Sequence, residues 1–110
     1  MKISRNWLQT FFGSPLPEAQ ALADALTFHA FEIESVDKVE GDDVLDVKVT
    51  PNRGHDCLSH RGIAKEISAI LDIPLKNDPL RASITLSPKV ETVTVVIKEP
   101  EFCSRYIAGY

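Results

Sequence analysis

Reactive and polar side chains are concentrated in one short stretch of the sequence, between residues 52 and 61. The stretch holds a thiol, a carboxylate, an amide, a hydroxyl, two imidazoles and two guanidinium groups: Asn52, Arg53, His55, Asp56, Cys57, Ser59, His60 and Arg61. Groups of these kinds can bind a metal ion, carry out nucleophilic catalysis or bind an anion. Each of these chemistries requires a particular spacing and particular neighbours.

A metal site could use Cys57 and His60, whose C-x-x-H spacing suits two ligands of one ion, with the preceding Asp or His as a third ligand. Zinc usually takes about four ligands, drawn from two separated pairs. The other His and Cys residues of the chain, His29 and Cys103, each stand alone in the sequence. A second pair of ligands is therefore missing, and the sequence predicts no metal site.

A catalytic site could pair the thiolate of Cys57 with the imidazole of His55 or His60. Such a nucleophile also needs donors that stabilise an oxyanion, and the sequence contains no recognisable loop for that purpose. A cysteine just before a helix is more often simply buried. We therefore predict that no residue of this chain is catalytic.

An anion site could use Arg53 and Gly54, because they precede a predicted helix whose N-terminus attracts negative charge. Asp56 would repel phosphate there, and the glycine-rich motifs of nucleotide-binding loops are absent from the sequence. Side chains of these polar types commonly fix tight loops through hydrogen bonds to nearby backbone. We therefore predict a structural loop stabilised by Asn52, Arg53 and Asp56, followed by Ser59 as the N-cap of the helix, with no cofactor-binding residue.

Composition limits the classes of protein to which the chain can belong. It has 110 residues, of which 44% are hydrophobic and 25% charged, as in ordinary globular domains. A net charge of −4 argues against a domain whose main task is to bind phosphate backbones. We find neither an apolar run of the ~20 residues that a membrane helix needs nor a secretory signal. The sequence thus predicts a cytoplasmic protein with reduced cysteines and no membrane partner.

The spacing of apolar residues predicts an α+β fold in which helices cover a β-hairpin. Helical periodicity extends over residues 17–29 and 59–71, and alternation typical of strands extends over residues 31–39 and 45–50. A shift in the alternation after Ile33 indicates a β-bulge, and residues 40–43 are typical of a turn. One core should contain residues from both helices and the hairpin: Leu22, Leu26, Leu45, Val47, Ile63, Ile67 and Ile70.

Smaller elements follow from local patterns. Residues 2–4 are able to form a short strand, and the aromatic residues between positions 7 and 12 have a helical spacing that should hold Trp7 against the core. Phe28 is assigned to the apolar face of the first long helix. Ala30 ends that helix and would cost on the order of 1 kcal/mol if its turn is left-handed. Residues 50–56 are predicted to be a loop.

The sequence predicts three segments along the chain. Residues 1–74 should form one small module, residues 75–90 a linker with several prolines in or beside it, and residues 91–110 an incomplete β segment of a following domain. The β-rich run near residue 110 has no partner strand of its own in this sequence, and strands of this kind need one. We therefore expect the chain to be the first part of a longer protein.

Four ordered blocks of the sequence resemble the bacterial phenylalanine–tRNA ligase beta subunit family. The longest begins T-P-N-R-G-H-D-C-L-S at residue 50 and continues as G-I-A-K-E-I from residue 62; it is similar to the family pattern T-P-N-R-x-D-x-L-S-x-x-G-x-A-R-E, with one residue more before the Asp. The other blocks are M-K-I-S-R-N-W-L at residues 1–8, the segment 22–36, and P-E-F-C-S-R-Y at residues 100–106. Ala30 departs from the pattern, which has Gly there.

This resemblance implies that the chain belongs to an enzyme but does not itself contain the reaction centre. The family's enzyme is an α2β2 class II aminoacyl-tRNA synthetase that joins phenylalanine to its tRNA with ATP and magnesium. Residues 1–74 would be a winged-helix-like helix–hairpin–helix module of its beta subunit, and residues 91–110 would begin the editing region. Most members insert a tRNA-binding OB-fold domain within the hairpin, where this chain has only residues 40–43. Expected partners of the whole enzyme are the alpha subunit and tRNA; no catalytic, cofactor-binding or metal residue carries over to this chain.

Two other functions are compatible with the residues. The first is a stand-alone winged-helix module that binds nucleic acid through cations along the second long helix, namely Arg53, Arg61 and Lys65. The second, weaker alternative is a metal protein with Cys57 and His60 as ligands.

Overall fold

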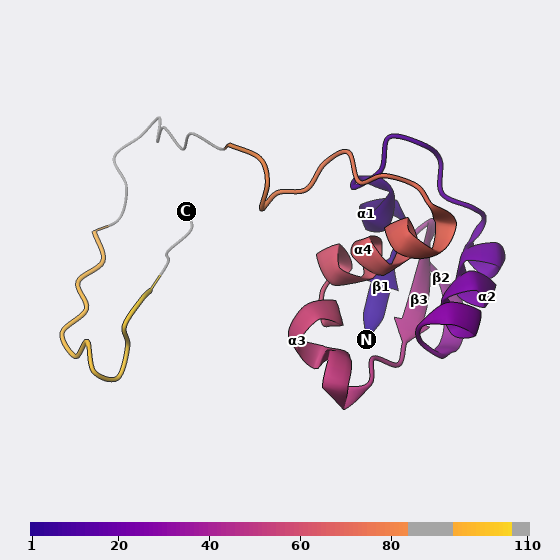
Figure 1. Ribbon diagram of the computed structural model, residues 1–110. Coiled ribbons are helices and arrows are strands. Elements are labelled where there is room, and N and C mark those ends of the chain that lie inside the picture. The colour runs from indigo at the N-terminus through magenta and orange to yellow at the C-terminus, as the bar shows by residue number, and fades with distance from the viewer. Residues whose placement is uncertain (84–93, 107–110) are drawn as a thin grey trace.

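A computed structural model of the chain describes residues 1–83 and 94–106 (Figure 1). The elements follow one another as β1 (Lys2–Ser4), α1 (Arg5–Gln9), α2 (Ala19–His29), β2 (Ile33–Val39), β3 (Asp42–Val47), the short 3-10 helix η1 (Pro51–Arg53), α3 (Gly54–Cys57) and α4 (His60–Leu71). This arrangement of helices with one small antiparallel sheet confirms the predicted α+β class.

The sheet has the strand order β1-β3-β2, with both neighbouring pairs antiparallel. The register shifts between Ile33 and Ser35, which confirms the bulge indicated by the sequence. Val39 pairs with Asp42, so the hairpin closes through only Glu40 and Gly41, at φ 49° and 87°. Positive φ at both positions suits the right-handed twist of a hairpin. The predicted turn at 40–43 is therefore too long, because its last two residues belong to β3.

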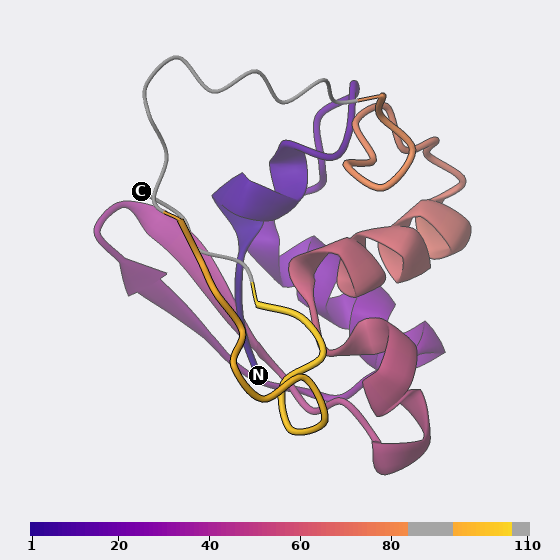
Figure 2. The same ribbon diagram turned by 90° about the vertical axis from the view of Figure 1, so that its left-hand side faces the viewer.

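The helices all lie on one side of the sheet (Figure 2), and the core lies between the two layers. Alternate residues of the strands face the helices, so Ile3, Leu45 and Val47 are fully buried. The predicted isoleucine stripe of α4 is confirmed: Ile63 and Ile67 are buried, and Ile70 packs against the core while partly exposed. Leu22 and Leu26 of α2 complete the same cluster.

Two aromatic residues assigned to the core are at the surface, so these predictions are wrong. The side chain of Phe28 is 83% exposed, because successive helical residues are rotated by ~100° and Phe28 therefore points almost opposite to Leu26. Trp7 is 57% exposed, whereas Phe11 and Phe12 fill the adjacent core. Ala30 has φ −139°, so the turn after α2 is not left-handed and the cost considered for it does not arise.

The segment before α4 is more regular than predicted. Residues 50–56 were expected to form a loop, yet they contain η1 and most of α3. Ser59 is the N-cap of α4, and its side-chain oxygen accepts a hydrogen bond from the Gly62 N–H at 3.0 Å. The helix ends at Leu71 because Asp72 adopts the left-handed conformation, with φ 53°, two residues before Pro74. The β3 strand ends at Val47, earlier than the predicted residue 50.

Residues 75–83 leave the module along α1. Leu75 forms an isolated β-bridge with Phe12, and the backbone N–H groups of Lys76 and Asn77 donate to the carbonyl oxygen of Phe11 at 2.9 and 3.1 Å. The described part of the segment at 91–110, residues 94–106, forms turns and bends without helix or strand. The predictions for residues 84–93 and 107–110 lie outside the described residues. In the described part of the chain, every helix is too short or too polar to cross a lipid bilayer.

Candidate functional site

The polar residues between β3 and α4 are organised around the guanidinium group of Arg53. Its Nη2 atom donates to Asp56 Oδ2 at 2.7 Å and to Glu66 Oε1 at 2.5 Å, and its Nε atom also donates to Asp56. The guanidinium carbon lies 5.6 Å from the centre of the Phe31 ring. One side chain therefore joins the end of η1, α3, α4 and Phe31, which lies between α2 and β2. The carboxylates of Asp56 and Glu66 raise the pKa of Arg53.

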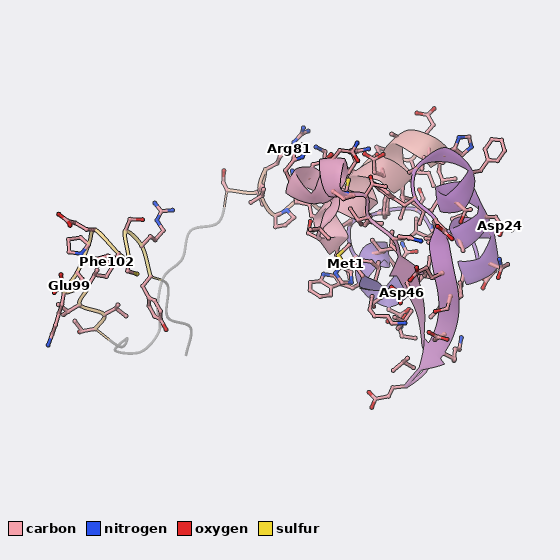
Figure 3. The ribbon with its side chains drawn as sticks, turned by 90° about the horizontal axis from the view of Figure 1, so that it is seen from below. Met1, Asp24, Asp46, Arg81, Glu99 and Phe102 are labelled. Atoms are coloured by element: carbon pink, nitrogen blue, oxygen red, sulfur yellow. The ribbon has the colours of Figure 1, made fainter. Side chains whose placement is uncertain are left out.

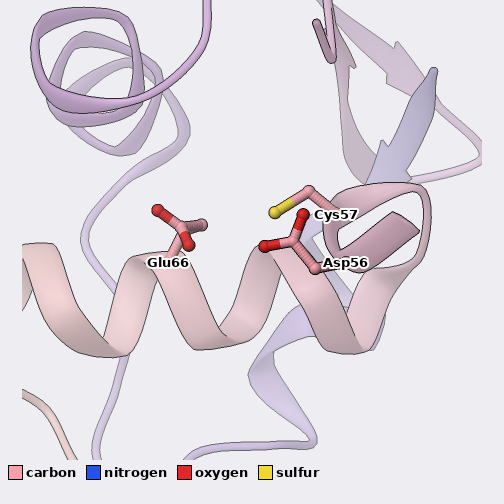
Figure 4. Close-up of side chains that lie close together, drawn as sticks. All are labelled: Asp56, Cys57 and Glu66. Atoms are coloured by element: carbon pink, nitrogen blue, oxygen red, sulfur yellow. The ribbon is translucent and has the colours of Figure 1, made fainter. Parts of the chain in front are cut away.

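Asp56, Cys57 and Glu66 form the group of side chains that most resembles a metal site (Figure 4). Their potential ligand atoms lie within 4.8 Å of one another. However, Arg53 Nη2 donates to a ligand atom of all three, including Cys57 Sγ at 3.3 Å. The permanently charged guanidinium group of Arg53 thus already occupies the position that a metal ion would take. His60, which was considered as a ligand together with Cys57, is not part of this group.

The Cys57 thiol lies in surroundings that disfavour a nucleophile. Its residue is 1% exposed, and burial raises the pKa of the thiol to about 11 despite the nearby Arg53. The thiol is therefore protonated at neutral pH, and only a thiolate reacts readily. His55 is mostly exposed and lies 3.7 Å from Asp56, whereas Nε2 of His60 accepts a hydrogen bond from the backbone of Ser4. Among the described residues, neither imidazole is hydrogen-bonded to Cys57.

Gly62 brings the backbone of α3 into direct contact with α4. A Cβ atom at this position would lie 2.0 Å from the carbonyl oxygen of Asp56 and 2.8 Å from Cys57 Cα. Both neighbours are backbone atoms, so they cannot rotate away as a flexible side chain can. The absence of a side chain at residue 62 therefore allows the close packing that brings Arg53, Asp56 and Glu66 together.

A second polar group joins β1 and α1 to β3 and α4. The Ser4 N–H donates to His60 Nε2 at 3.0 Å, and the Ser4 hydroxyl donates to Asp42, whose other oxygen accepts from the Asn6 N–H at 3.0 Å. The ring of His60 stacks on Trp7 with centroids 3.9 Å apart. Burial lowers the pKa of His60, against the opposing effect of Asp42. The imidazole is therefore a neutral acceptor that helps to position the first helix.

The arginines that the nucleic-acid hypothesis requires are already paired with carboxylates. Arg61 binds both oxygens of Asp78 at 2.7 Å, and this interaction lowers the pKa of Asp78 to about 2. Arg53 is occupied by Asp56 and Glu66, as described above, and it lowers the pKa of Asp56 to about 2. Lys65 is exposed on α4. Two of the three cations proposed to meet phosphate therefore have their charges neutralised within the module.

The residues predicted for a structural loop occupy distinct positions. Arg53 and Asp56 are joined to each other, Ser59 caps α4, and Asn52 is exposed within η1. Glu66, which also pairs with Arg53, was not among the residues predicted from the sequence. A half-buried acid directly beside the isoleucine stripe of α4 is the signal that could have identified it.

Comparisons with known proteins give a consistent result, although no protein-family model matches the chain. The chain is 36% identical over 98% of its length to a phenylalanine–tRNA ligase beta subunit of Rhodopirellula baltica, and 32% identical over 99% to the chloroplastic beta subunit of Porphyra purpurea. A beta subunit of Coxiella burnetii is 45% identical over 60% of the chain. The chain spans 16%, 15% and 8% of these relatives, respectively.

Proposed function

Because nearly the whole chain is homologous to phenylalanine–tRNA ligase beta subunits, we propose that it is the N-terminal structural and interaction module of such a subunit. The whole enzyme would attach phenylalanine to its tRNA with ATP and magnesium, in the cytoplasm. Its partners would be the alpha subunit, in an α2β2 assembly, and tRNA. Catalysis would take place elsewhere in that assembly.

The observation that carries this proposal is that the reactive side chains of the T-P-N-R block are paired with one another or buried. Arg53 is paired with both Asp56 and Glu66, and the Cys57 thiol is buried and protonated. Residues consumed in this way stabilise the packing of α3 against α4 rather than face a substrate. A module of this kind supplies a rigid body to a larger protein.

The finer assignment concerns the type of module. We assign residues 1–74 to a winged-helix-like module, residues 75–90 to a linker and residues 91–110 to the first part of the following, editing-region domain. The β2–β3 hairpin closes through Glu40 and Gly41 alone, which supports the proposal that this chain lacks the OB-fold domain that most relatives are expected to insert there. Contact with tRNA through such a domain would accordingly be absent from this module.

A chimera tests this proposal directly. The matching segment of the Rhodopirellula baltica beta subunit is replaced by this chain, and the chimera is co-expressed with its alpha subunit. We expect subunit assembly and phenylalanylation of tRNA comparable to the parent enzyme. A chimera carrying Ile67→Asp, which places a charge in the core, should lose assembly. An active assembly despite Ile67→Asp, or an inactive chimera whose module is folded, would refute the proposed role.

A second measurement concerns the chain alone. ATP–pyrophosphate exchange dependent on phenylalanine should be undetectable with the 110-residue chain. Exchange above the background of a matched preparation without the chain would show that the module contains a reaction centre.

A further inference from the structure

An open groove of about 540 Å³ lies between α1 and the segment that leaves α4. Its apolar lining comes from both sides: Trp7, Phe11, Leu75, Pro79 and Ala82. Backbone hydrogen bonds from residues 76 and 77 to Phe11, and one from the Asn77 side chain to the carbonyl oxygen of Thr10 at 2.9 Å, hold the two walls together. The groove is therefore formed before any partner binds.

Trp7 gives this groove a rigid aromatic wall. The residue is 57% exposed, and its ring is held by stacking on His60. Tryptophan residues in preformed pockets often dominate the binding energy of interfaces, because they bury a large area with little loss of conformational freedom. An apolar side chain of a partner would find a fixed surface here.

Cations surround the groove although the chain as a whole has a charge of −4. Lys76 and Arg81 line it, and Arg81 projects from the edge of the module (Figure 3). Lys65 and Arg81 also line an adjoining hollow beneath the same segment. The carboxylate within this region, Asp78, is bound by Arg61 at 2.7 Å and lies 3.7 Å from Arg81, so the cations of the region outnumber it. The rim of the groove is thus positive on an otherwise acidic protein.

We propose that this groove binds an acidic polypeptide segment, independently of the module's role in a ligase. An apolar side chain of the segment lies against Trp7, and flanking carboxylates pair with Lys76 and Arg81. Nucleic acid fits less well, because the lining is mainly apolar whereas phosphate backbones are bound chiefly through charge. Opposite charges around an apolar anchor are typical of specific protein–protein recognition.

Trp7 is the single tryptophan of the chain, so its fluorescence reports directly on the groove. The 110-residue chain is titrated with a capped peptide that has glutamates on both sides of a Leu-Phe pair. We expect a saturable change in the fluorescence of Trp7. The double variant Lys76→Glu/Arg81→Glu should weaken binding at least about tenfold, which corresponds to 1.4 kcal/mol. The charge-matched double variant Lys38→Glu/Lys48→Glu, whose two positions lie on the hairpin strands or directly after them and outside the groove, should bind like the parent chain.

Two control peptides and an RNA oligonucleotide test whether binding requires both the acidic and the apolar residues of the peptide. A peptide with lysines in place of the glutamates, and one with serines in place of the Leu-Phe pair, should each fail to change the fluorescence of Trp7. Circular dichroism verifies that every variant is folded. The proposal is overturned by an absence of saturable binding of the acidic peptide, by equal binding to the double variant, or by tighter binding of a single-stranded RNA oligonucleotide than of the peptide.

Discussion

Replacing Gly62 with alanine should destabilise the module, although alanine normally favours a helix. Within a helix, Gly→Ala stabilises by roughly 1 kcal/mol. Here the new methyl carbon would lie 2.0 Å from the carbonyl oxygen of Asp56, so α3 and α4 must separate. Overpacking of this kind costs about 1–3 kcal/mol, and the upper end applies because the neighbours are backbone atoms. Subtracting the gain in helix propensity gives a net loss of about 2 kcal/mol.

Gly54→Ala is the matched control for this prediction. Gly54 is also helical, but its added methyl group would meet only the side chain of Leu58, at 3.3 Å, and Leu58 is exposed and free to rotate. We expect Gly54→Ala to leave stability unchanged or to raise it by up to about 1 kcal/mol. The two variants therefore make the same chemical change with opposite expected signs.

The assay is urea unfolding followed by far-UV circular dichroism. Gly62→Ala should lower the midpoint of unfolding with little change in the slope, and should lower Tm by about 8–16 °C for a domain of this size. A Gly62→Ala variant as stable as the parent chain would show that α3 does not approach α4 as closely as described. The packing of Arg53, Asp56 and Glu66 would then need another explanation.

Three further predictions concern the core, the titrating groups and the thiol. Ile67→Ala should lower the free energy of unfolding in urea by about 2–5 kcal/mol, because Ile67 is fully buried; a loss below 1 kcal/mol would contradict its place in the core. The free energy of unfolding should fall as the pH drops below 6.5, because the folded state lowers the pKa of His60 and the unfolded chain takes up that proton first. It should fall further between pH about 4 and 2, because Asp56 has a pKa of about 2 in place of 3.8. Urea titrations at a series of pH values test both steps, and His60→Gln should remove the upper one. A free energy of unfolding that rises on acidification would contradict both predictions. Iodoacetamide at pH 8 should alkylate the partly exposed Cys103 before Cys57, whose pKa is about 11; mass spectrometry that finds Cys57 modified first in the folded chain would contradict this order.

The sequence was most informative where local chemistry determines the structure. The Ser59 cap, the isoleucine stripe of α4 and the bulge after Ile33 each depend on residues within a few positions of one another, and all three are confirmed. The boundaries of the turn at 40–43 were less accurate because Asp42 is recruited into β3 by contacts with a distant part of the chain. Its carboxylate accepts hydrogen bonds from Ser4 and Asn6, which no local pattern indicates.

The candidate site was predictable in its composition but not in its connections. The pairing of Arg53 with Asp56 is local, since the two residues are three positions apart. The pairing of Arg53 with Glu66 depends on the angle at which α4 returns past α3, and the close contact at Gly62 sets that angle. The position of the Trp7 ring likewise depends on its stacking on His60, a residue far from it in the sequence. Long-range packing of this kind is decided by tertiary structure, where propensity is weak.

The tip of the β2–β3 hairpin is a natural point of entry for engineering. Glu40 and Gly41 are exposed, and no atom lies within 4 Å of where a side chain at Gly41 would begin. The strand ends that flank them, Val39 and Asp42, are directly paired, so their Cα atoms lie only about 4.5–5.5 Å apart. A guest protein whose own termini are neighbours could be spliced between them while the host keeps its register and its core. Because Val39 and Asp42 are so close, a whole domain can also be gained or lost at this turn during evolution without disturbing the strands.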